Sequence, residues 1–176
     1  MTSPPPAWPD TLPPPRDPAG PYRICLVCLG NICRSPMAET VLRAELDRAG
    51  LGGRVRVDSA GTGDWHAGNP MDRRARAELA ARGYDGASHR ARQFRAEWLA
   101  GRDLVLAMDT ANRDDLGRMG AEPGRLAMLR SFDPASGPDA EVPDPYYGDG
   151  GSFGLALDQI EAAARGLAGA LRAALG

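Results

Sequence analysis

The fold is decided by the stretch Cys28-Leu29-Gly30-Asn31-Ile32-Cys33-Arg34-Ser35, which joins an apolar run at residues 24–27 to a helical pattern that opens at Pro36. It therefore has the form of a strand-to-helix turn. Backbone N–H groups in such a turn point inward, and the helix N-terminus adds partial positive charge. Gly30 permits a close approach of the backbone, and Asn31 tolerates a left-handed conformation. We expect residues 28–35 to bind a dianion such as phosphate.

Within this turn, Cys28 is the candidate nucleophile. Backbone amides, the helix N-terminus and Arg34 all favour its thiolate over its thiol. The Arg34 guanidinium can bind two phosphate oxygens side by side, which a lysine could not do, and the Ser35 hydroxyl can donate to the sulfur. A cysteine and an arginine with five residues between them also occur by chance. The strand before the turn, the helix after it and Ser35-Pro36 at its end favour the catalytic interpretation.

Composition limits the possible classes of protein. The length of 176 residues suits one domain with a sizeable core, and the net charge of −2 does not favour nucleic acid or membrane binding. The three cysteines lie between residues 25 and 33, which is not the spacing of a secreted disulfide framework. No apolar run is long enough for a transmembrane helix, and the N-terminus does not resemble a signal peptide. We therefore expect a cytoplasmic protein.

The segment 1–21 differs from the rest of the chain. It holds nine of the 16 prolines, so it cannot pair strands or form a helix, and we expect it to be disordered or to form polyproline II. Its Pro-x-x-Pro spacings allow docking of a partner, although a tail without function is the favoured interpretation. Residues 22–176 are predicted to form the folded domain.

In residues 22–176, predicted strands alternate with predicted helices. The strands are residues 23–28, 55–59, 104–108 and 126–129, and the helices are residues 36–49, 70–82, 110–119 and 153–175. Asn69 is the expected N-cap of the second helix, with Pro70 at its first position and Gly83 after its end. This order predicts a single α/β domain: a central four-stranded parallel sheet with helices on both faces and the phosphate-binding loop after the first strand.

The long polar loop at residues 131–151 is the expected source of a general acid, since long loops of this kind are usually functional or disordered. Cleavage of a phosphate ester is assisted by a group that protonates the leaving oxygen as the bond breaks. Four aspartates of the loop could supply that proton, and the residues alone leave the choice open: Asp133, Asp139, Asp144 and Asp149.

The loop at residues 28–36 resembles the active-site loop of the low-molecular-weight protein tyrosine phosphatases, in a bacterial, actinobacterial-like form. The resemblance covers residues 22–176 and continues in five further stretches: Asp58-Ser59-Ala60-Gly61-Thr62, Trp65-His66, His89-Arg90-Ala91-Arg92-Gln93, Ala107-Met108-Asp109 and Asp144-Pro145-Tyr146-Tyr147-Gly148. It implies that Cys28 is the nucleophile, that Arg34 binds the phosphate and that Asp144 is the general acid. Residues 29–33 and Ser35 would form the rest of the phosphate-binding loop: Leu29, Gly30, Asn31, Ile32 and Cys33.

The resemblance also implies roles outside the loop. Trp65 would form one wall of the substrate cleft, while Tyr146 and Tyr147 would form the other and are candidate phosphorylation sites. Three polar residues would support the loop through side-chain hydrogen bonds: Asn31, Ser59 and His89. We expect His66 to be exposed and Asp109 to cap the helix that follows it. The arginines at positions 73, 74, 76 and 92 are expected on solvated faces.

Cys33 has a possible redox role. It could capture an oxidised Cys28 as a disulfide and so prevent irreversible oxidation. The alternative is a small buried side chain, and the resemblance favours the redox role. Cys25 lies on the buried strand and is expected in the core.

The sequence therefore predicts a cysteine-dependent phosphatase that hydrolyses phosphotyrosine in proteins through a phosphocysteine intermediate, with no cofactor and no metal. Three alternatives remain. An arsenate reductase of similar fold would need further cysteines downstream, and none follows Cys33. A protein-arginine phosphatase typically has threonine at the position of Ile32 and lacks the tyrosine pair. A non-catalytic phosphoprotein-binding module should lack Cys28, Arg34 or Asp144.

Overall fold

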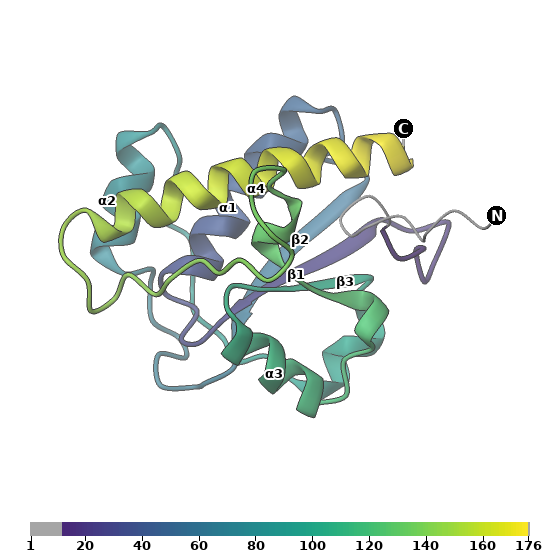
Figure 1. Cartoon of the computed structure of the whole chain (residues 1–176), viewed down its shortest axis with the longest axis horizontal. Helices are drawn as coiled ribbons and strands as arrows, with labels where there is room; N and C mark the ends of the chain where they lie inside the picture. Colours follow the sequence, from purple (N-terminus) through teal and green to yellow (C-terminus); the bar gives the residue numbers. More distant parts are fainter. Residues whose placement is uncertain (1–11, 176) are drawn as a thin grey trace.

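A computed structural model describes residues 12–175. Four parallel strands form one sheet in the order β2-β1-β3-β4: β1 (Tyr22–Cys28), β2 (Val55–Gly61), β3 (Leu104–Ala107) and β4 (Leu126–Met128). Helices cover both faces of the sheet (Figure 1). The predicted α/β fold with a four-stranded parallel sheet is thus confirmed, and the strand boundaries differ from the expected ones by one or two residues.

Strand β1 lies inside the sheet because its side chains are apolar on both faces. Ile24 and Leu26 face one core cluster, whereas Cys25 and Val27 face a second cluster on the opposite side. All four of these side chains are fully buried. A strand buried on both faces must have partners on both edges to satisfy its backbone groups, and β2 and β3 provide them.

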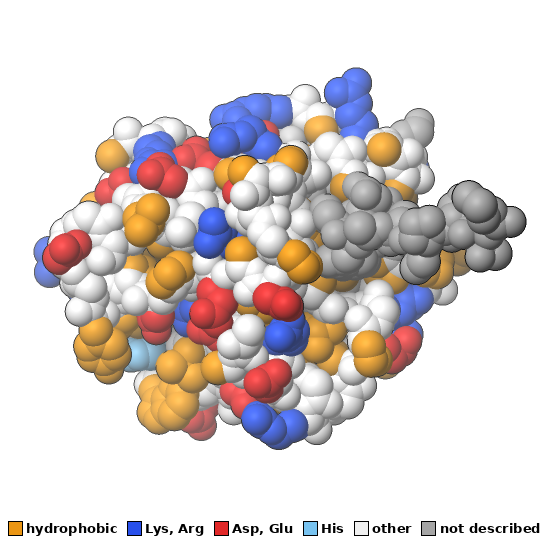
Figure 2. Space-filling model, viewed as in Figure 1, with side chains coloured by type: hydrophobic (Ala, Val, Ile, Leu, Met, Phe, Trp, Pro, Cys, Tyr) orange, Lys and Arg blue, Asp and Glu red, His pale blue; other side chains and the backbone are white. Residues whose placement is uncertain are grey.

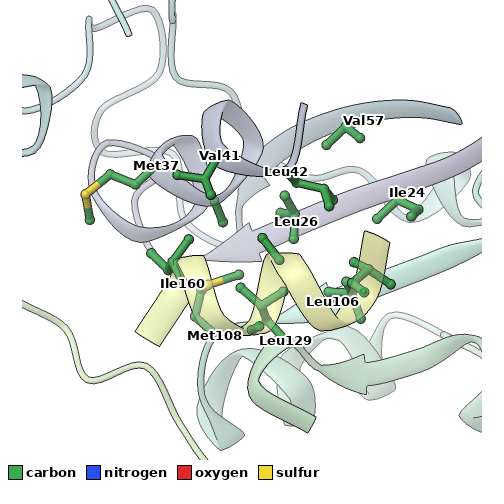
Figure 3. Packing of buried hydrophobic residues seen from close by; sticks show 14 of the residues in the cluster. Ile24, Leu26, Met37, Val41, Leu42, Val57, Leu106, Met108, Leu129 and Ile160 are labelled. Atoms are coloured by element: carbon green, nitrogen blue, oxygen red, sulfur yellow. The ribbon is translucent and has the colours of Figure 1, made fainter. Parts of the chain in front are cut away.

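Three helices pack together on the larger core cluster: α1 (Arg34–Arg48), α2 (Arg73–Ala81) and α4 (Ser152–Leu175). Figure 3 shows Met37, Val41 and Leu42 of α1 over β1, with Ile160 of α4 beside them. On the other face, α3 (Thr110–Arg118) and the 3₁₀-helix η1 (Ala96–Gly101) cover the smaller cluster. Two short 3₁₀-helices flank β4, η2 (Pro123–Arg125) and η3 (Leu129–Phe132).

The predicted start of the second helix is wrong. Helix α2 begins at Arg73, because the Asp72 carboxylate caps it by accepting the Arg74 backbone N–H at 2.8 Å. The backbone of Asn69 is instead used within the preceding loop, where its N–H donates to His66 and its carbonyl accepts from Ala91. The predicted cap of α3 is confirmed, since Asp109 accepts the backbone N–H of Asn112.

The prediction of disorder or polyproline II for residues 1–21 has two outcomes. Residues 1–11 lie outside the described residues, whereas residues 12–21 contact the domain at the amino-terminal ends of β1, β3 and β4. The Arg16 backbone N–H donates to Asp103 Oδ1 at 2.7 Å, and the Tyr22 hydroxyl donates to the Pro13 carbonyl at 2.8 Å. The Arg125 guanidinium donates to the Pro14 carbonyl. The last ten residues of the proline-rich segment are therefore bound to the domain rather than detached from it.

Strand β2 lies at one edge of the sheet, and two arginines cover its outer side. Arg43 of α1 donates to the Val57 carbonyl at 2.7 Å, and Arg92 donates through Nε to the Ser59 carbonyl at 3.1 Å. Arg92 also pairs with Asp58. The outward carbonyls of Val57 and Ser59 are therefore occupied by side chains of the same chain.

The sheet order fixes where a ligand can bind. From β1 the chain goes to β2 on one side, and β3 lies on the other side. In open parallel sheets, ligands bind beyond the carboxyl end of the strand at which the order reverses. Residues 28–35 lie directly at that end of β1.

We expect Asp103→Asn to destabilise the protein by about 1–3 kcal/mol, the cost of unsatisfied buried hydrogen-bonding groups. The buried Asp103 carboxylate accepts the backbone N–H of Arg16 on one oxygen and the backbone N–H of Arg23 on the other, each at 2.7 Å. An asparagine would turn its NH₂ group toward one of these two donors. Urea unfolding of the full chain measures the effect, with Asp114→Asn, at an exposed position of α3, as the matched control. Equal losses in both variants would contradict the assigned role of Asp103.

Candidate active site

The loop between β1 and α1 is built around Asn31. This residue is fully buried and has φ 57°, and it is the one non-glycine residue with positive φ among residues 12–175. The left-handed turn allows its backbone N–H to donate to Cys28 Sγ at 3.3 Å. Helix α1 then starts at Arg34 with Cys33 as its N-cap. The expected anion-binding geometry, with a turn followed by a helix N-terminus, is therefore present.

The Cys28 sulfur has a second polar partner in Ser35, whose Oγ lies 3.0 Å away. Asn31 Nδ2 donates to the same Ser35 oxygen at 2.8 Å. The hydroxyl proton of Ser35 is therefore left to donate, either to the sulfur or to the Ala60 carbonyl at 3.4 Å. The shorter contact is to the sulfur, so the geometry favours a hydroxyl that stabilises a thiolate.

The side chain of Asn31 holds the loop against its neighbours. Its Nδ2 also donates to Ser59 Oγ at 3.0 Å, and its Oδ1 accepts the Arg92 backbone N–H at 3.0 Å. Ser59 in turn donates to Glu39 of α1 at 2.6 Å. The structure thus brings Asn31 and Ser59 together in one buried hydrogen-bond network.

His89 completes this network from outside. Its Nε2 lies 2.7 Å from the Asn31 carbonyl, and since a carbonyl can only accept, Nε2 carries the proton. Burial lowers the pKa of His89 below its ordinary value, although the hydrogen bond to Asn31 opposes this shift. The imidazole is therefore held neutral, which suits a supporting role rather than proton transfer.

Arg34 is buried, with 2 % of its surface exposed. Its Nη1 donates to Asp109 Oδ2 at 2.7 Å and to the Val142 carbonyl at 2.9 Å, while its Nη2 lies 3.6 Å from Asp144 Oδ2. Burial lowers the pKa of Arg34, but the charges of Cys28, Asp109 and Asp144 outweigh this effect and raise it above the ordinary value. The guanidinium is thus fixed in place and charged.

The Cys28 sulfur lies at a pocket of about 320 Å³. The pocket is lined by the loop between β1 and α1, by the loop after β2 and by the loop before α4: Cys28, Leu29, Gly30, Ile32, Cys33, Arg34, Trp65, His66, Asp144, Tyr146 and Tyr147. Trp65 and Tyr147 are 70 % and 92 % exposed. Figure 2 shows hydrophobic side chains gathered beside a histidine at one end of the face in view, with charges of both signs interspersed elsewhere.

Of the four candidate aspartates, only Asp144 lines this pocket within the described part of the chain. Asp139 pairs with Arg113 at 2.7 Å. Asp133 and Asp149 accept backbone N–H groups two residues further on, as turn aspartates do. Asp144 makes the same local bond, through Oδ1 to the Tyr146 N–H at 3.1 Å, and its Oδ2 faces Arg34.

One expectation is wrong, and two further residues make contacts that the sequence did not indicate. His66 was expected to be exposed, but it is half-buried in the pocket wall, with its ring 6.2 Å from that of Tyr146. Asp109 caps α3 and also binds Arg34, which sequence reasoning missed. Arg74 is exposed, as expected, and its guanidinium also lies over two aromatic rings, those of Tyr146 and Phe153. No local signal in the sequence indicates these contacts, because each partner is distant along the chain.

The other two cysteines are buried and free. Burial raises the pKa of Cys33, and the nearby charges of Asp72 and Cys28 raise it further. Cys25 lies in the core on the other side of the sheet, where burial raises its pKa well above the ordinary value. Both side chains are therefore held as neutral thiols.

Two kinds of feature are absent from residues 12–175. No group of three or more His, Cys, Asp and Glu side chains is placed to hold a metal ion in this part of the chain. No helix within the same residues has the length and hydropathy to cross a membrane.

Known proteins resemble the chain over the whole domain. The family model of the low molecular weight phosphotyrosine protein phosphatases matches residues 23–175. A low molecular weight protein-tyrosine-phosphatase of Streptomyces coelicolor is 50 % identical over 155 residues, which cover 86 % of this chain and 94 % of that protein.

Solved structures agree with this. The crystal structure of YfkJ from Bacillus subtilis superimposes with a TM-score of 0.84 at 33 % identity, covering 91 % of this chain and all of that one. A mutant of the YwlE arginine phosphatase with a phosphorylated active-site serine has a TM-score of 0.72 at 28 % identity, covering 85 % and 95 %. The family-model match over residues 23–175 and the 50 % identity to the Streptomyces coelicolor protein show that this chain belongs to the low molecular weight protein tyrosine phosphatases, a family of hydrolytic phosphatases.

Proposed function

We propose that this protein hydrolyses phosphotyrosine in proteins through a phosphocysteine intermediate. The observation that carries the proposal is the convergence of Cys28, Arg34 and Asp144 on one pocket with aromatic walls. The loop amides and the guanidinium bind the phosphate, and the sulfur at the pocket floor faces the phosphorus atom. Asp144 approaches from a different loop, so it can reach the ester oxygen opposite the sulfur.

In the first step, the Cys28 thiolate attacks phosphorus in line. The S–P bond forms as the bond from phosphorus to the phenolic oxygen breaks, and Asp144 gives its proton to that oxygen. The products are a phosphocysteine and a neutral tyrosine side chain. Arg34 and the loop amides bind the equatorial oxygens throughout, where preorganised donors are most effective.

In the second step, water attacks the phosphocysteine. Asp144, now ionised, accepts a proton from the water as the new P–O bond forms, and the S–P bond breaks. The Ser35 hydroxyl, 3.0 Å from the sulfur, stabilises the departing thiolate. Inorganic phosphate leaves, and the Asp144 carboxyl and the Cys28 thiolate are restored. The phosphorylated active-site serine of the YwlE mutant shows that a residue of a related active site can carry the phosphoryl group.

A phosphoarginine substrate is the strongest alternative, because an arginine phosphatase is among the structural neighbours. Ile32 and the pair Tyr146-Tyr147, all three in the pocket lining, support phosphotyrosine instead. The aromatic lining of the pocket, formed by Trp65, Tyr146 and Tyr147, supports an aromatic side chain over phosphoserine, which has no ring to contact it. An arsenate reductase is disfavoured because no cysteine follows Cys33.

The proposed setting is the cytoplasm, with tyrosine-phosphorylated proteins as partners. Docking of another protein through residues 1–21 would use their Pro-x-x-Pro spacings, and Pro18 of the second spacing is exposed. Asn31, Ser59 and His89 are proposed to support the loop, given their hydrogen bonds.

We also propose that Cys33 protects Cys28 from oxidation. Hydrogen peroxide converts the Cys28 thiolate to a sulfenic acid, and the Cys33 thiol displaces water from it to form a disulfide. The raised pKa of Cys33 slows this capture. Conversion of Cys28 to the neutral sulfenic acid removes one of the charges that raise that pKa.

Hydrolysis of a phosphotyrosine peptide, measured in EDTA and reductant, tests the mechanism. Cys28→Ser should be inactive because it lacks the nucleophile. Asp144→Ala should lower turnover of phosphotyrosine by about 10²–10⁴-fold, the usual contribution of a general acid, and should affect 2,4-dinitrophenyl phosphate much less. A wild-type protein that hydrolyses phosphoarginine or reduces arsenate but leaves phosphotyrosine intact would exclude the proposed substrate.

Trp65→Ala tests the aromatic slot. Contact with an aromatic ring contributes on the order of 1 kcal/mol, so kcat/KM for phosphotyrosine peptides should fall about fivefold to tenfold. Hydrolysis of alkyl phosphates should change little, since they have no ring to contact. Equal losses on aryl and alkyl phosphates would show that Trp65 does not form the slot.

Cys33→Ser should keep most of its activity but lose recovery from oxidation. After peroxide treatment, dithiothreitol should reactivate the wild type by reducing its disulfide. The variant should stay inactive, because its Cys28 sulfenic acid has no thiol to capture it and oxidises further to a sulfinic acid that dithiothreitol does not reduce. Cys25→Ala removes the other buried thiol and is the matched control. Unchanged reactivation of Cys33→Ser would exclude the protective role.

A further inference from the structure

The side chain of Arg74, in the first turn of α2, lies between two aromatic rings. Its guanidinium carbon is 5.3 Å from the centre of the Tyr146 ring and 4.6 Å from that of Phe153. Tyr146 belongs to the loop that carries Asp144, and Phe153 belongs to the first turn of α4. Figure 1 shows α2 beside the start of α4, which brings the two segments together.

Arg74 also makes hydrogen bonds to two residues, Tyr146 in the loop before α4 and Asp72 at the start of α2. Its Nη1 donates to the Tyr146 carbonyl at 3.0 Å, while Nε and Nη2 donate to the two carboxylate oxygens of Asp72, at 3.1 and 3.0 Å. The Asp72 backbone N–H donates to the Ile32 carbonyl at 2.9 Å. One guanidinium therefore connects the loop of the general acid to a residue bonded to the catalytic loop.

The contact continues to the carboxylate itself, because the Tyr146 N–H donates to Asp144 Oδ1 at 3.1 Å. Arg74 holds the carbonyl and the ring of Tyr146, and the N–H of the same residue holds one oxygen of Asp144. The Asp144 side chain is otherwise half in solvent and lies 3.6 Å from Arg34. Its orientation therefore depends on few contacts.

We propose that Arg74 is a positioning residue for the general acid, linking the Asp144 loop to the Cys28 loop through Asp72 and Tyr146. The proposal rests on the proposed function of Asp144. Arginine is required because only a planar guanidinium can stack on two rings and bind a carboxylate with two N–H groups at the same time.

Arg74→Met tests the link, since methionine keeps an unbranched stem and removes the guanidinium. A displaced acid matters only for a poor leaving group. Accordingly, kcat/KM should fall about tenfold for phosphotyrosine and less than about twofold for 2,4-dinitrophenyl phosphate, in line with the sensitivity of catalysis to small displacements. Arg74→Lys should give an intermediate loss. Arg76→Met, at an exposed position of the same helix, should match the wild type.

A double-mutant cycle with Asp144→Ala separates positioning from a general structural effect. If Arg74 acts through Asp144, adding Arg74→Met to Asp144→Ala should cause no further loss on phosphotyrosine. An equal loss on both substrates, or the same loss with and without Asp144, would overturn the proposal.

The two hypotheses fail in different ways. If Asp144→Ala discriminates between the leaving groups and Arg74→Met does not, the proposed mechanism stands and the positioning role is excluded. If Asp144→Ala itself shows no such discrimination, the general acid is misassigned and the inference about Arg74 falls with it. Thermal unfolding of each variant shows whether it is folded. If Arg74→Met does not fold, Arg74→Lys is compared with the wild type on the same two substrates.

Discussion

The left-handed backbone of Asn31 is the constraint on which the site depends. That conformation turns the chain between β1 and α1 within a few residues, so that an amide points at the Cys28 sulfur and Arg34 begins a helix. Left-handed backbone costs free energy in a residue other than glycine. The buried side chain offsets this cost with hydrogen bonds to Ser35, Ser59 and the Arg92 backbone. A glycine would allow the turn but could not make these bonds.

The rest of the fold brings a second loop to this turn. Strand β1 is an inner strand, buried on both faces, and the strand order reverses at β1. The loop after β1 therefore lies at the carboxyl end of the sheet, at that point of reversal. Helix α4 packs on α1, and the loop that precedes it, residues 133–151, lies at the same end of the sheet. The candidate nucleophile, Cys28, and the candidate acid, Asp144, therefore come from parts of the chain more than one hundred residues apart, and the charges of both act on Arg34.

Much of this was accessible from the sequence. Strand and helix alternation, together with the apolar pattern of each element, predicted the sheet, and the resemblance in residues 28–36 and 144–148 indicated the pocket residues. What failed depended on distant partners. Asn69 and Pro70 carry a helix-start pattern, but tertiary hydrogen bonds placed the cap at Asp72. The exposure of Arg74 was predicted, but its contact with Tyr146, which lies 72 residues later in the chain, has no local signal in the sequence.

The covered edge of β2 has a consequence for self-association. An exposed strand edge is a template for pairing with another chain, and charged side chains or short edge strands are common defences. Here guanidinium groups of Arg43 and Arg92 occupy outward carbonyls of β2, and the opposite edge strand, β4, has only three residues. Neither edge offers a neighbouring molecule a continuous ladder of hydrogen bonds. The sheet is therefore protected against edge-to-edge pairing with a neighbouring molecule.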